Sequence, residues 1–493
     1  LMSSEHLASA QNQLKGDLAG AWNILDGASG QYTDLGIARR FGGAAAAYSL
    51  RDVGAMNGRV VKVRREQDTT PVDFSAGAIA SGGVEQFAIG QSVLDKYNDA
   101  AYFPADTAYF SLTNIALTGS FTITASFIYT GDEDKDEMTL FYGNASRDTI
   151  TFTDYSTFRF RRDADNKTLT LDSDIKKNTL HTLVVTRDGS NVVSISIDGV
   201  TQTNTITESG TYNIDRLGFR NRGTIFDINI NGVAAYTGDG ADVSNWTDTI
   251  GSNDATKVGA PVAFTGQGIS AFVDTWYDQS GNGRDVDQST TSLQPKIINN
   301  GSLVTLNSKP AISFADDGVR LSVTRFLTSQ GNTYFAAYDV TNSLYPSDAG
   351  TVIRQGTNFR IGMNVLGGSD AGKIRTQLRD SGADQTRADT SSSFDGQTIL
   401  QTSIISATRG AGGIKTFVNS ANEASADSTD VQDVDYTTVE NPNSTNNAFY
   451  IGSNNLGNFD FLGNLGEVIL FNTDLTADKT DLENDINNHY SIY

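Results

Sequence analysis

One stretch of the sequence gathers residue types that could bind a cation. It runs from Trp276 to Gly283 (Trp-Tyr-Asp-Gln-Ser-Gly-Asn-Gly), and Asp285 follows two residues later. Asp278 and Asp285 supply carboxylate oxygens, and a glycine-containing loop can wrap such oxygens round Ca²⁺. The loop lacks the Asp-x-Asp-x-Asp spacing and the closing Glu of a helix-loop-helix calcium site. We therefore predict a turn in which the Asp278 side chain bonds to nearby backbone, with Gly281 and Gly283 as turn residues, and keep calcium as the alternative.

The same pattern occurs in degenerate form about thirty residues upstream. There Trp246, Asp248, Gly251 and Asp254 repeat, in order, the Trp, Asp, Gly and Asp of the downstream loop. A turn motif that occurs twice in this way indicates repeated structural modules.

Aromatic side chains offer a second kind of chemistry, because a sugar ring can stack on the face of a tryptophan. Trp246 and Trp276 both lie just before turn loops, where such a platform could be displayed. A buried core anchor is the competing interpretation of both, and it is the one we favour. We keep the two tryptophans as weak candidates for ligand binding.

Catalytic chemistry has few candidates. The chain has no cysteine and only three histidines, which excludes thiolate chemistry and disulfides. Glu467, in Gly-Glu-Val-Ile-Leu, is the most suggestively placed acid, but a strand residue paired with a turn amide or a basic side chain is the favoured interpretation. His181 begins an apolar strand and has no nucleophile-elbow motif to serve. We assign no catalytic residue and expect no cofactor.

Composition limits the class of protein and of partner. The 493 residues have room for about two to four domains. A net charge of -22 disfavours nucleic acid as a partner, and no apolar run is long enough for a membrane helix. High glycine, with Ser, Thr, Asn and Asp between short apolar runs, predicts an all-β protein. No signal peptide is visible, and the initial Leu1 indicates a processed or incomplete product.

Helices are expected only near the two ends. Residues 5–25 carry leucines at steps of 7, 4 and later 7, which predicts a helix that packs on a neighbouring domain or associates with copies of itself, for example as a trimer. A terminal helix is predicted with Thr476 as N-cap and with Leu482, Ile486 and Tyr490 on one face.

Several segments resemble known families. Ala-Tyr-Ser-Leu-Arg at 47–51, Val-Arg-Arg at 63–65, Asp73-Phe74, the Trp276 stretch and Gln294-Pro-Lys-Ile297 are similar to the amino-terminal part of the α-L-arabinofuranosidase B catalytic domain. They are equally similar to phage virion proteins, such as tail-fibre proteins, that carry laminin-G-like or concanavalin-like sandwiches. The resemblance covers about 41–75 and 268–297. In those relatives the two segments are nearly contiguous, whereas roughly 180 residues intervene here, so the resemblance implies an insertion.

The inserted residues predict a complete sandwich of their own. Gly119–Phe127 alternates strictly, and Leu180–Gly189 with Val192–Gly199 predicts a hairpin. The carboxyl-terminal third repeats this plan: Phe103, Asp106 and Ser111 align without gaps on Phe314, Asp317 and Ser322, and Thr408-Arg409 is matched to Thr186-Arg187. We therefore predict two sandwiches of the concanavalin A-like or laminin-G-like class, one inserted in the other. The predicted division is a helix and linker at 1–40, a split host sandwich at 41–90 plus 263–493, and an insert at 91–262.

Two hypotheses for function follow. In the first, the resemblance implies a non-enzymatic virion protein (tail fibre, head fibre or capsid-associated) that binds other virion proteins or a host-surface glycan and forms a homo-oligomer. In the second, the chain is a secreted glycoside hydrolase or carbohydrate-binding protein of arabinofuranosidase-like type. The arabinofuranosidases resemble one another in cysteines that this chain lacks, and we favour the first hypothesis.

Overall fold

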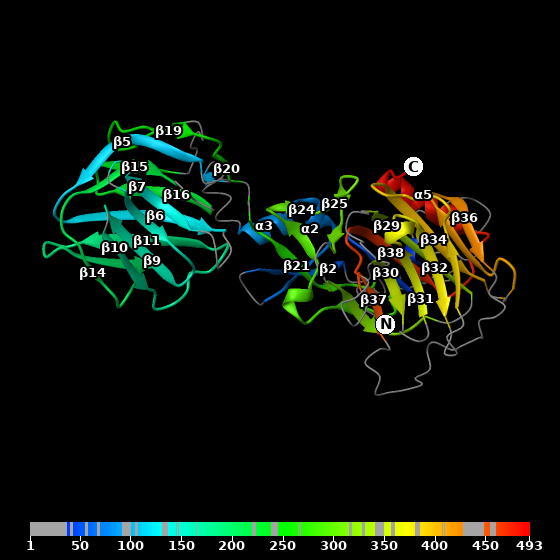
Figure 1. The fold of residues 1–493 in the computed structure, drawn as a ribbon. Coiled ribbons are helices and arrows are strands. Elements are labelled where there is room, and N and C mark those ends of the chain that lie inside the picture. Colours follow the sequence, from blue (N-terminus) through cyan, green and yellow to red (C-terminus); the bar gives the residue numbers. More distant parts are fainter. Residues whose placement is uncertain are drawn as a thin grey trace, which may run out of the picture.

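The computed structural model shows an all-β protein in two lobes (Figure 1). No helix in the described part of the chain is long and apolar enough to cross a membrane. The structure describes the following residues: 37–39, 43–54, 58–66, 70–90, 100–103, 107–130, 137–143, 145, 147–163, 165–218, 223–237, 245–264, 266, 268–314, 318–327, 331–340, 350–355, 360–379, 385–406, 408, 410–426, 448–453 and 460–493.

The first lobe is built from two antiparallel sheets, which we call together the β4–β20 sandwich. One sheet has the order β10 (Asp165–Thr170), β9 (Thr157–Arg162), β8 (Asp148–Phe152), β7 (Met138–Gly143), β15 (Tyr212–Leu217), β5 (Tyr109–Leu117), β19 (Ala255–Val258) and β18 (Asn245–Trp246). The other has the order β13 (Val200–Thr201), β12 (Val192–Ile197), β11 (Leu180–Arg187), β6 (Phe121–Tyr129), β16 (Gly223–Ile230), β4 (Ala101–Phe103) and β20 (Val262–Ala263), with β14 (Ile206–Thr207) on β12 and β17 (Ala234–Tyr236) on β16. Alternate residues of both sheets fill one apolar core between them.

The second lobe, the split sandwich, combines strands from the two ends of the described chain. One row of paired strands is β1 (Ala46–Ser49), β38 (Asn464–Phe471), β29 (Asn332–Asp339), β34 (Thr398–Ile405), β35 (Ile414–Val418) and β36 (Ala421–Ala426). The facing row is β22 (Val286–Asp287), β28 (Leu321–Thr324), β37 (Ala448–Ile451), β30 (Gly350–Gln355), β31 (Arg360–Val365), β32 (Ile374–Arg379) and β33 (Gln385–Asp389).

Shorter strands join these two rows into one hydrogen-bonded network. They are β2 (Val61–Arg65), β3 (Val72–Phe74), β21 (Ala271–Trp276), β23 (Lys296–Asn299), β24 (Ser302–Leu303) and β27 (Ile312–Ser313), with a separate hairpin of β25 (Thr305–Leu306) and β26 (Lys309–Pro310). The helical elements are η1 (Ile37–Arg39), α2 (Ala76–Ala80), α3 (Gly83–Ile89), η2 (Thr291–Leu293), η4 (Gly368–Asp370) and α5 (Lys479–Tyr490).

The two sandwiches share one strand arrangement. The order β17-β16-β6-β11-β12-β13 in the first lobe corresponds to β1-β38-β29-β34-β35-β36 in the second, and β19-β5-β15-β7-β8-β9-β10 corresponds to β22-β28-β37-β30-β31-β32-β33. The register agrees too: Leu217 faces Phe110 as Ile451 faces Leu321. In the chain, β17 follows the body of its sandwich, whereas β1 precedes its own. The two lobes therefore have the same arrangement of strands in space, but the chain enters that arrangement at a different strand in each lobe.

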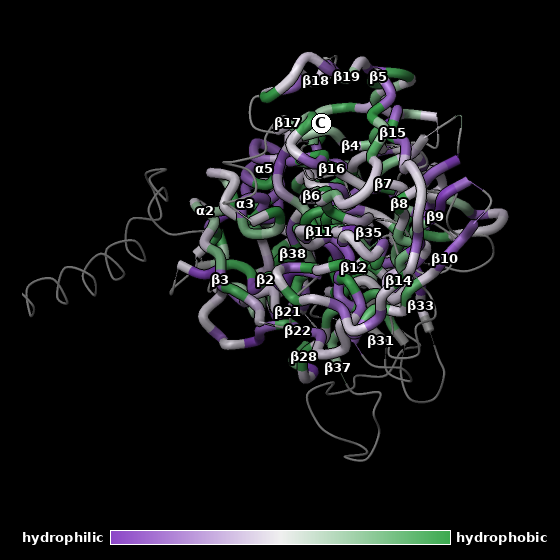
Figure 2. The backbone as a smooth tube through the Cα atoms, turned by 90° about the vertical axis from the view of Figure 1, so that its left-hand side faces the viewer, coloured by the Kyte–Doolittle hydropathy of each residue, from purple (hydrophilic) through white to green (hydrophobic). Residues whose placement is uncertain are grey.

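Burial follows the hydrophobic pattern of the strands, along which hydrophobic and hydrophilic residues are interspersed (Figure 2), and each lobe has a hydrophobic core of its own. Trp246 lies in the core of the β4–β20 sandwich and Trp276 in that of the split sandwich. A smaller core under α5 holds Leu482, Ile486 and Tyr490, the face predicted from the sequence.

The predicted all-β fold class with few helices is confirmed. The hairpin of β11 and β12 is confirmed as well. The amino-terminal helix at 5–25 lies outside the described residues, and the division at 90/91 and 262/263 stays a prediction.

Three sequence-based assignments need correction or completion. Helix α5 begins at Lys479 with Asp478 as its N-cap, so Thr476 as N-cap is wrong. Thr476 is instead held in a turn, where its backbone N–H and its hydroxyl bond to Asp474 Oδ1 at 3.0 and 2.6 Å. The short helices α2 and α3 were not foreseen, because helices of 5 and 7 residues carry too little periodicity to detect.

The pairing of Thr408-Arg409 with Thr186-Arg187 is also wrong. Leu183 faces Ala125 in one lobe and Gln401 faces Ala336 in the other, so Leu183 and Gln401 occupy equivalent positions. Four residues further along each strand, the position equivalent to Arg187 is therefore Ile405. Arg409 lies outside the described residues.

Candidate functional site

The loop after Trp276 forms a closed set of hydrogen bonds that we call the Asp278 clasp. Asp278 Oδ1 accepts from Ala47 N at 3.0 Å and from Ser280 N at 2.9 Å. Its Oδ2 accepts from Arg284 N at 3.0 Å and from the Ser280 hydroxyl at 2.8 Å. The Asp278 N–H in turn donates to Asp285 Oδ1 at 2.8 Å. Both Asp278 oxygens are therefore already engaged by the chain, as in an Asx-type turn.

The glycines of this loop have turn conformations. Gly281 and Gly283 have φ of 89° and 67°, a region that glycine adopts without steric cost. Among the residues that the structure describes, no group of three or more acidic or histidine side chains is arranged to hold a metal ion.

The upstream loop forms the equivalent Asp248 clasp. Asp248 Oδ1 accepts from Ala235 N at 3.0 Å and Ile250 N at 3.1 Å, and its N–H donates to Asp254 Oδ1 at 2.9 Å. Although burial acts to raise the pKa of Asp248, the backbone N–H donors from Ala235, Asn253 and Ile250 outweigh it and lower that pKa. The two loops thus repeat one hydrogen-bonding scheme as well as one sequence pattern.

Each clasp includes a Tyr–Trp pair. Tyr48 OH donates to Arg284 O and Tyr236 OH donates to Asn253 O, both at 2.6 Å. The Tyr48 and Trp276 ring centroids are 5.9 Å apart, and those of Tyr236 and Trp246 are 6.3 Å apart.

Both tryptophans are core residues. Trp246 is 1 % exposed and Trp276 is 0 % exposed, so neither indole has a face open to a sugar ring. A stacking role for Trp246 or Trp276 therefore has no support in the structure.

The sequence-selected acid and histidine are engaged within the protein. Glu467 is 1 % exposed and lies on β38. Its oxygens accept from Ser49 Oγ at 2.7 Å and from Arg51 Nε and Nη2 at 2.8 and 2.9 Å. His181 is buried, with Nδ1 2.7 Å from Asp198 Oδ2. Glu467 is thus a strand residue paired with a basic side chain.

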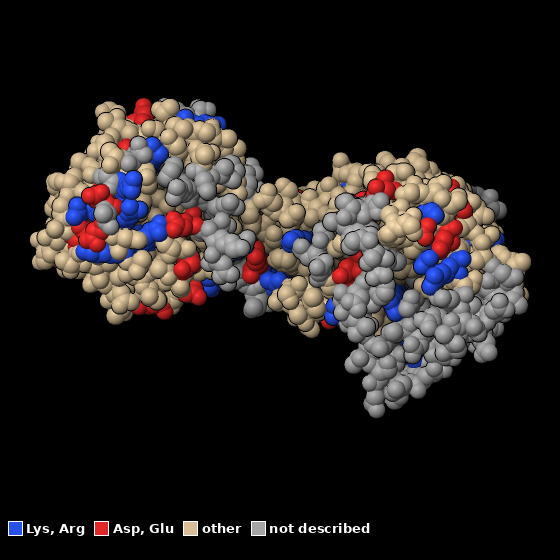
Figure 3. Space-filling model, in the orientation of Figure 1, with Lys and Arg blue, Asp and Glu red and all other residues tan. Residues whose placement is uncertain are grey.

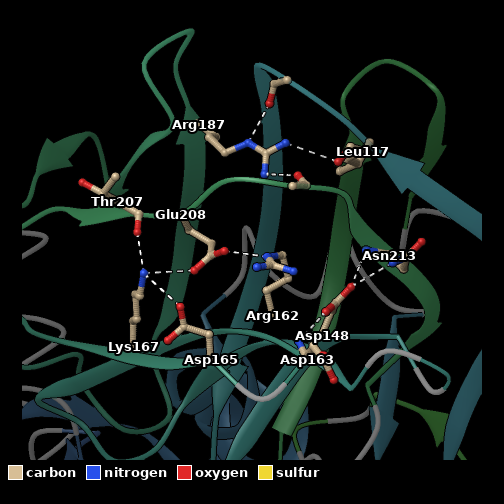
Figure 4. Close-up of polar contacts among 12 residues, drawn as sticks. Leu117, Asp148, Arg162, Asp163, Asp165, Lys167, Arg187, Thr207, Glu208 and Asn213 are labelled. Atoms are coloured by element: carbon tan, nitrogen blue, oxygen red, sulfur yellow. Dashed lines mark hydrogen bonds and ion pairs between the residues drawn. The ribbon is translucent and has the colours of Figure 1, made fainter.

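A second group of buried carboxylates closes one end of the β4–β20 sandwich (Figure 4). Asp148 accepts from Asp163 N at 2.9 Å and from Asn213 N at 2.7 Å. Glu208 pairs with Arg162 at 2.5 Å and with Lys167 at 3.1 Å. Because these pairs join β9 and β10 of one sheet to the segment after β14 of the other, they fasten the two sheets together.

Buried Arg187 completes this end. It is 1 % exposed and donates to the carbonyl oxygens of Gly119, Gly210 and Leu117 at 2.6, 2.7 and 3.3 Å. Burial lowers the pKa of Arg187. Its guanidinium is thus satisfied by backbone carbonyls at the ends of strands, which is a structural role.

The arrangement of these acids bears on hydrolysis. A glycosidase needs two carboxyl groups facing a sugar across about 5–10 Å. The carboxylate oxygens of Asp148, Glu208 and Glu467 instead accept hydrogen bonds from donors within the protein. In the described part of the chain, these three buried acids therefore have structural roles.

The outward face of the β10–β18 sheet presents the arrangement best suited to a ligand. Arg216 faces Tyr142, Tyr142 faces Thr149 and Thr149 faces Arg161 on the consecutive strands β15, β7, β8 and β9. We call these four residues the outward row. Their neighbours along each strand, such as Leu217, Phe141, Ile150 and Phe160, point into the core, so the row itself points away from it.

Two features of the outward row go beyond an ordinary solvated face. The Arg216 guanidinium lies 4.5 Å from the Tyr109 ring centroid and 5.5 Å from that of Tyr142, within cation–π range. Thr149 is only 6 % exposed, and its hydroxyl has no hydrogen-bond partner. A buried polar atom without a partner is uncommon and marks a place where a ligand atom could bond.

Sequence reasoning missed the outward row. Its residues come from four strands separated by up to 74 positions, and each strand alone shows only the usual alternation of core and surface residues. The one available signal was the basic alternation in Phe-Arg-Phe-Arg at 158–161.

No protein-family model matches the chain, and no curated protein matches its sequence. Among solved structures, the chain is similar to domains LG4-5 of the mouse laminin alpha1 chain, with 13% identity and a TM-score of 0.25 over 76% of this chain and 89% of that one. It is also similar to the ligand-binding domain of botulinum neurotoxin serotype D in complex with N-acetylneuraminic acid, with 14% identity and a TM-score of 0.30 over 44% of this chain and 47% of that one.

A third similar structure is a putative carbohydrate-binding protein from Bacteroides ovatus, with 14% identity and a TM-score of 0.27 over 34% of this chain and 62% of that one. The chain thus spans about half the length of the neurotoxin domain that it matches. At identities and TM-scores this low, the similarity identifies neither a family nor a ligand.

Proposed function

We propose that this chain is a non-enzymatic virion protein whose β-sandwiches bind carbohydrate on a host surface. The observation that carries the binding role is the outward row, in which the Arg216 guanidinium lies over two tyrosine rings and one of these tyrosines, Tyr142, faces Thr149, whose buried hydroxyl has no partner. Aromatic rings with a few placed polar groups are the usual components of a sugar site. The assignment to a virion rests on the sequence resemblance, with other virion proteins and copies of the same chain as further partners.

The engagement of the buried acids supports the absence of hydrolysis. Glu467 and Glu208 are held in ion pairs with Arg51 and Arg162, so their oxygens contact basic side chains of the protein itself. We expect no release of sugar from arabinan or other glycans. If the protein releases reducing ends from a glycan, and substitution of a single Asp or Glu abolishes this release, the secreted hydrolase would be favoured instead.

Binding is tested with the full chain on an array of immobilised glycans. Tyr142→Ala should abolish or strongly reduce the signal, because it removes one ring and the side chain between Arg216 and Thr149. Tyr277→Ala is the matched control: Tyr277 also carries a stacked arginine, Arg59 at 4.7 Å, but belongs to the split sandwich. Equal signals from Tyr142→Ala and the unaltered protein would exclude the outward row as the site.

The location of the protein is tested separately. Mass spectrometry and immuno-electron microscopy of purified particles should find the chain in the virion. Light scattering of the purified chain should give the mass of an oligomer, and a trimer is the expected state. A monomer that is absent from particles and secreted by cells would contradict this part of the proposal.

A further inference from the structure

We infer that the outward row binds an internal segment of a linear polysaccharide, which lies across the strands and passes over Thr149. This inference rests on the proposed function and adds which part of the carbohydrate chain is recognised. It is carried by the length of the polar row, by the way burial changes along it, and by the contrast between two buried threonines on the same face of β8.

The polar row continues beyond the outward row at both ends. Ser111 faces Arg216 and Thr256 faces Ser111 at one end, and Asn166 faces Arg161 at the other. We call these three added residues and the outward row together the extended row, which crosses β19, β5, β15, β7, β8, β9 and β10. Neighbouring strands lie ~4.8 Å apart, so the row spans about 29 Å. A row of this length can contact several consecutive sugar units of one chain.

The side chains of the extended row suit a ligand rich in hydroxyl groups. Each of them carries a group that can donate a hydrogen bond, and Tyr142 adds an aromatic ring on which a sugar face can stack. None of the seven is an acid or an aliphatic residue. Every sugar unit along the row would therefore meet at least one hydrogen-bonding side chain.

Burial is greatest inside the extended row and least at its two ends. Thr256 and Asn166, the end residues, are exposed, and Thr149 between them is only 6 % exposed. The other four residues are half-buried. A site that receives the end of a carbohydrate chain is closed on one side, whereas this row is open on both. The burial pattern therefore favours a chain that continues past the site in both directions.

The hydroxyl of Thr149 differs from that of its neighbour Thr151. Both residues lie on the outward face of β8, and Thr151 is 0 % exposed. Thr151 Oγ1 lies 3.0 Å from Thr139 Oγ1, so these two hydroxyls satisfy each other. Thr149 Oγ1 is buried without a hydrogen-bond partner. Because an unbonded buried hydroxyl costs free energy, a sugar hydroxyl that bonds to Thr149 removes that cost.

The arginines of the row are held in place by the protein. Arg216 forms an ion pair with Asp215 at 3.8 Å and lies over two tyrosine rings. Arg161 Nε donates to the Asp163 carbonyl at 2.8 Å. Figure 3 shows basic and acidic side chains intermingled on this lobe. We therefore expect recognition through sugar hydroxyls and ring faces, with the arginines as ordered donors, and no requirement for a charged ligand.

The equivalent row of the split sandwich lacks the central hydroxyl. There Arg354 faces Gly362, which stands at the position of Thr149, and Gly362 faces Gln377. Arg354 and Gln377 are only 4 % and 2 % exposed. The inferred site is therefore assigned to the β4–β20 sandwich alone.

The length of chain that is recognised is tested with the full-length protein and linear oligosaccharides of two, four, six and eight units from cellulose, mannan, arabinan and dextran. In each series that binds, the dissociation constant from isothermal titration should fall at least tenfold between two and six units. An octamer with bulky groups on both terminal units should bind as tightly as the unmodified octamer, because a site for an internal segment contacts neither end.

The role of the central hydroxyl is tested with a matched pair of variants. Thr149→Val should weaken binding of the hexamer at least tenfold and should not lower the Tm, because the lost hydroxyl has no partner in the free protein. Thr151→Val should leave binding nearly unchanged and lower the Tm, because it leaves the Thr139 hydroxyl without its partner. A purely structural Thr149 would not give this crossed result.

The extent of the row is tested at its exposed end. Asn166→Ala should weaken binding of the hexamer at least threefold and leave binding of the dimer unchanged. Thr168→Ala is the matched control, because Thr168 is the next exposed residue on the same face of β10 but faces Arg159, outside the row. Circular dichroism of each variant separates loss of binding from loss of folding.

The outcomes separate the two proposals. If dimer and hexamer bind equally tightly and Tyr142→Ala abolishes both, the row binds carbohydrate but recognises only a short unit, and the inference is wrong. If Thr149→Val binds the hexamer as tightly as the unaltered chain, the buried hydroxyl has no part in binding, which also overturns it. If no oligosaccharide binds at any length and the glycan array gives no signal either, the proposed function itself fails.

Discussion

The two sandwiches carry the same clasp on very different stretches of chain. In the β4–β20 sandwich, Asp248 holds Ala235, which is 13 residues away. In the split sandwich, Asp278 holds Ala47, which is 231 residues away. β17 is also fixed by its short turn to β16, whereas β1 pairs with β38, which lies far from it in the chain. The comparison shows that one hydrogen-bonding unit can close a sandwich either locally or across an insertion.

The interiors differ more than the clasps. The core positions Phe160, Leu183 and Val185 of the β4–β20 sandwich correspond by register to Thr376, Gln401 and Ser403 of the split sandwich. There Tyr338 OH donates to Gln401 Oε1 at 2.6 Å, and Gln401 Nε2 donates to Ser403 Oγ at 3.1 Å.

This polar network crosses between the facing rows of strands. Thr376 Oγ1 lies 2.6 Å from Ser403 Oγ and 2.8 Å from Thr416 Oγ1. Thr376 comes from β32, while Ser403 and Thr416 come from β34 and β35. A buried network of hydrogen-bonded side chains is satisfied in one alignment of the two rows of strands. An apolar core is less specific, because it requires mainly that the side chains fill the space between the rows.

The largest expected effect tests whether the two lobes are equivalent. Gly218 and Gly452 have φ of 78° and 94°, and a Cβ at either would collide with the ring of Phe103 or Phe314. Gly218→Ala and Gly452→Ala should each lower the free energy of unfolding by about 3 kcal/mol or more. Urea denaturation measures both. Gly232→Ala, at a positive φ with open space around it, should cost only about 1 kcal/mol. A large loss at only one of Gly218 and Gly452 would contradict the equivalence of the lobes, and a loss at Gly232 as large as theirs would show that the ring contact is not the cause.

The next effect separates the two clasps. Asp278→Ala leaves four donors without their acceptor and should cost about 3 kcal/mol. Hydrogen exchange should become much faster at the Ala47 amide, because β1 pairs with β38, which lies far from it in the chain, and not with a hairpin partner. In the matched variant Asp248→Ala, exchange at Ala235 should rise less, because β17 keeps its hairpin with β16. If hydrogen exchange accelerates equally at the Ala47 and Ala235 amides, the number of residues between the aspartate and the amide that it holds does not affect how firmly the strand is held.

The polar interior gives a smaller effect. Thr376→Val is nearly isosteric but removes a hydroxyl that contacts Ser403 and Thr416, so it should cost about 1–3 kcal/mol. Phe160→Leu in the other lobe tests an apolar position of the same register and should cost about 1 kcal/mol. The difference is measured by thermal unfolding; a stabilised Thr376→Val would mean that the network is less favourable than an apolar core.

The smallest effect concerns pH and belongs to the split sandwich, against which α5 packs. Burial, followed by the charge of Arg51, lowers the pKa of His489 to about 4 from its ordinary 6.5. The unfolded chain therefore takes up this proton more readily, and stability falls as pH drops from about 6.5 toward 4. Because His489 is partly exposed, solvent screening reduces the expected loss to about 1 kcal/mol. Urea denaturation at pH 7 and pH 5 should show a smaller difference for His489→Asn than for the unaltered chain; an unchanged difference would assign the pH dependence to other groups.

The sequence by itself predicted much of the strand content and the existence of a repeat. Strict alternation in 119–127 predicted β6, and the ungapped match of Ser111 with Ser322 is reproduced by the register of β5 and β28. These predictions succeeded because alternation and short loops are local properties of the chain.

Only the tertiary structure decided where side chains from distant strands meet. The burial of Trp246 and Trp276, the engagement of both Asp278 oxygens and the outward row of Arg216, Tyr142, Thr149 and Arg161 all depend on pairing and register. A shift of one residue in any of those strands would turn the row into the core. Register is fixed by the packing of the whole sandwich rather than by any single strand, and for that reason the sequence determined the kind of fold while the structure determined the site.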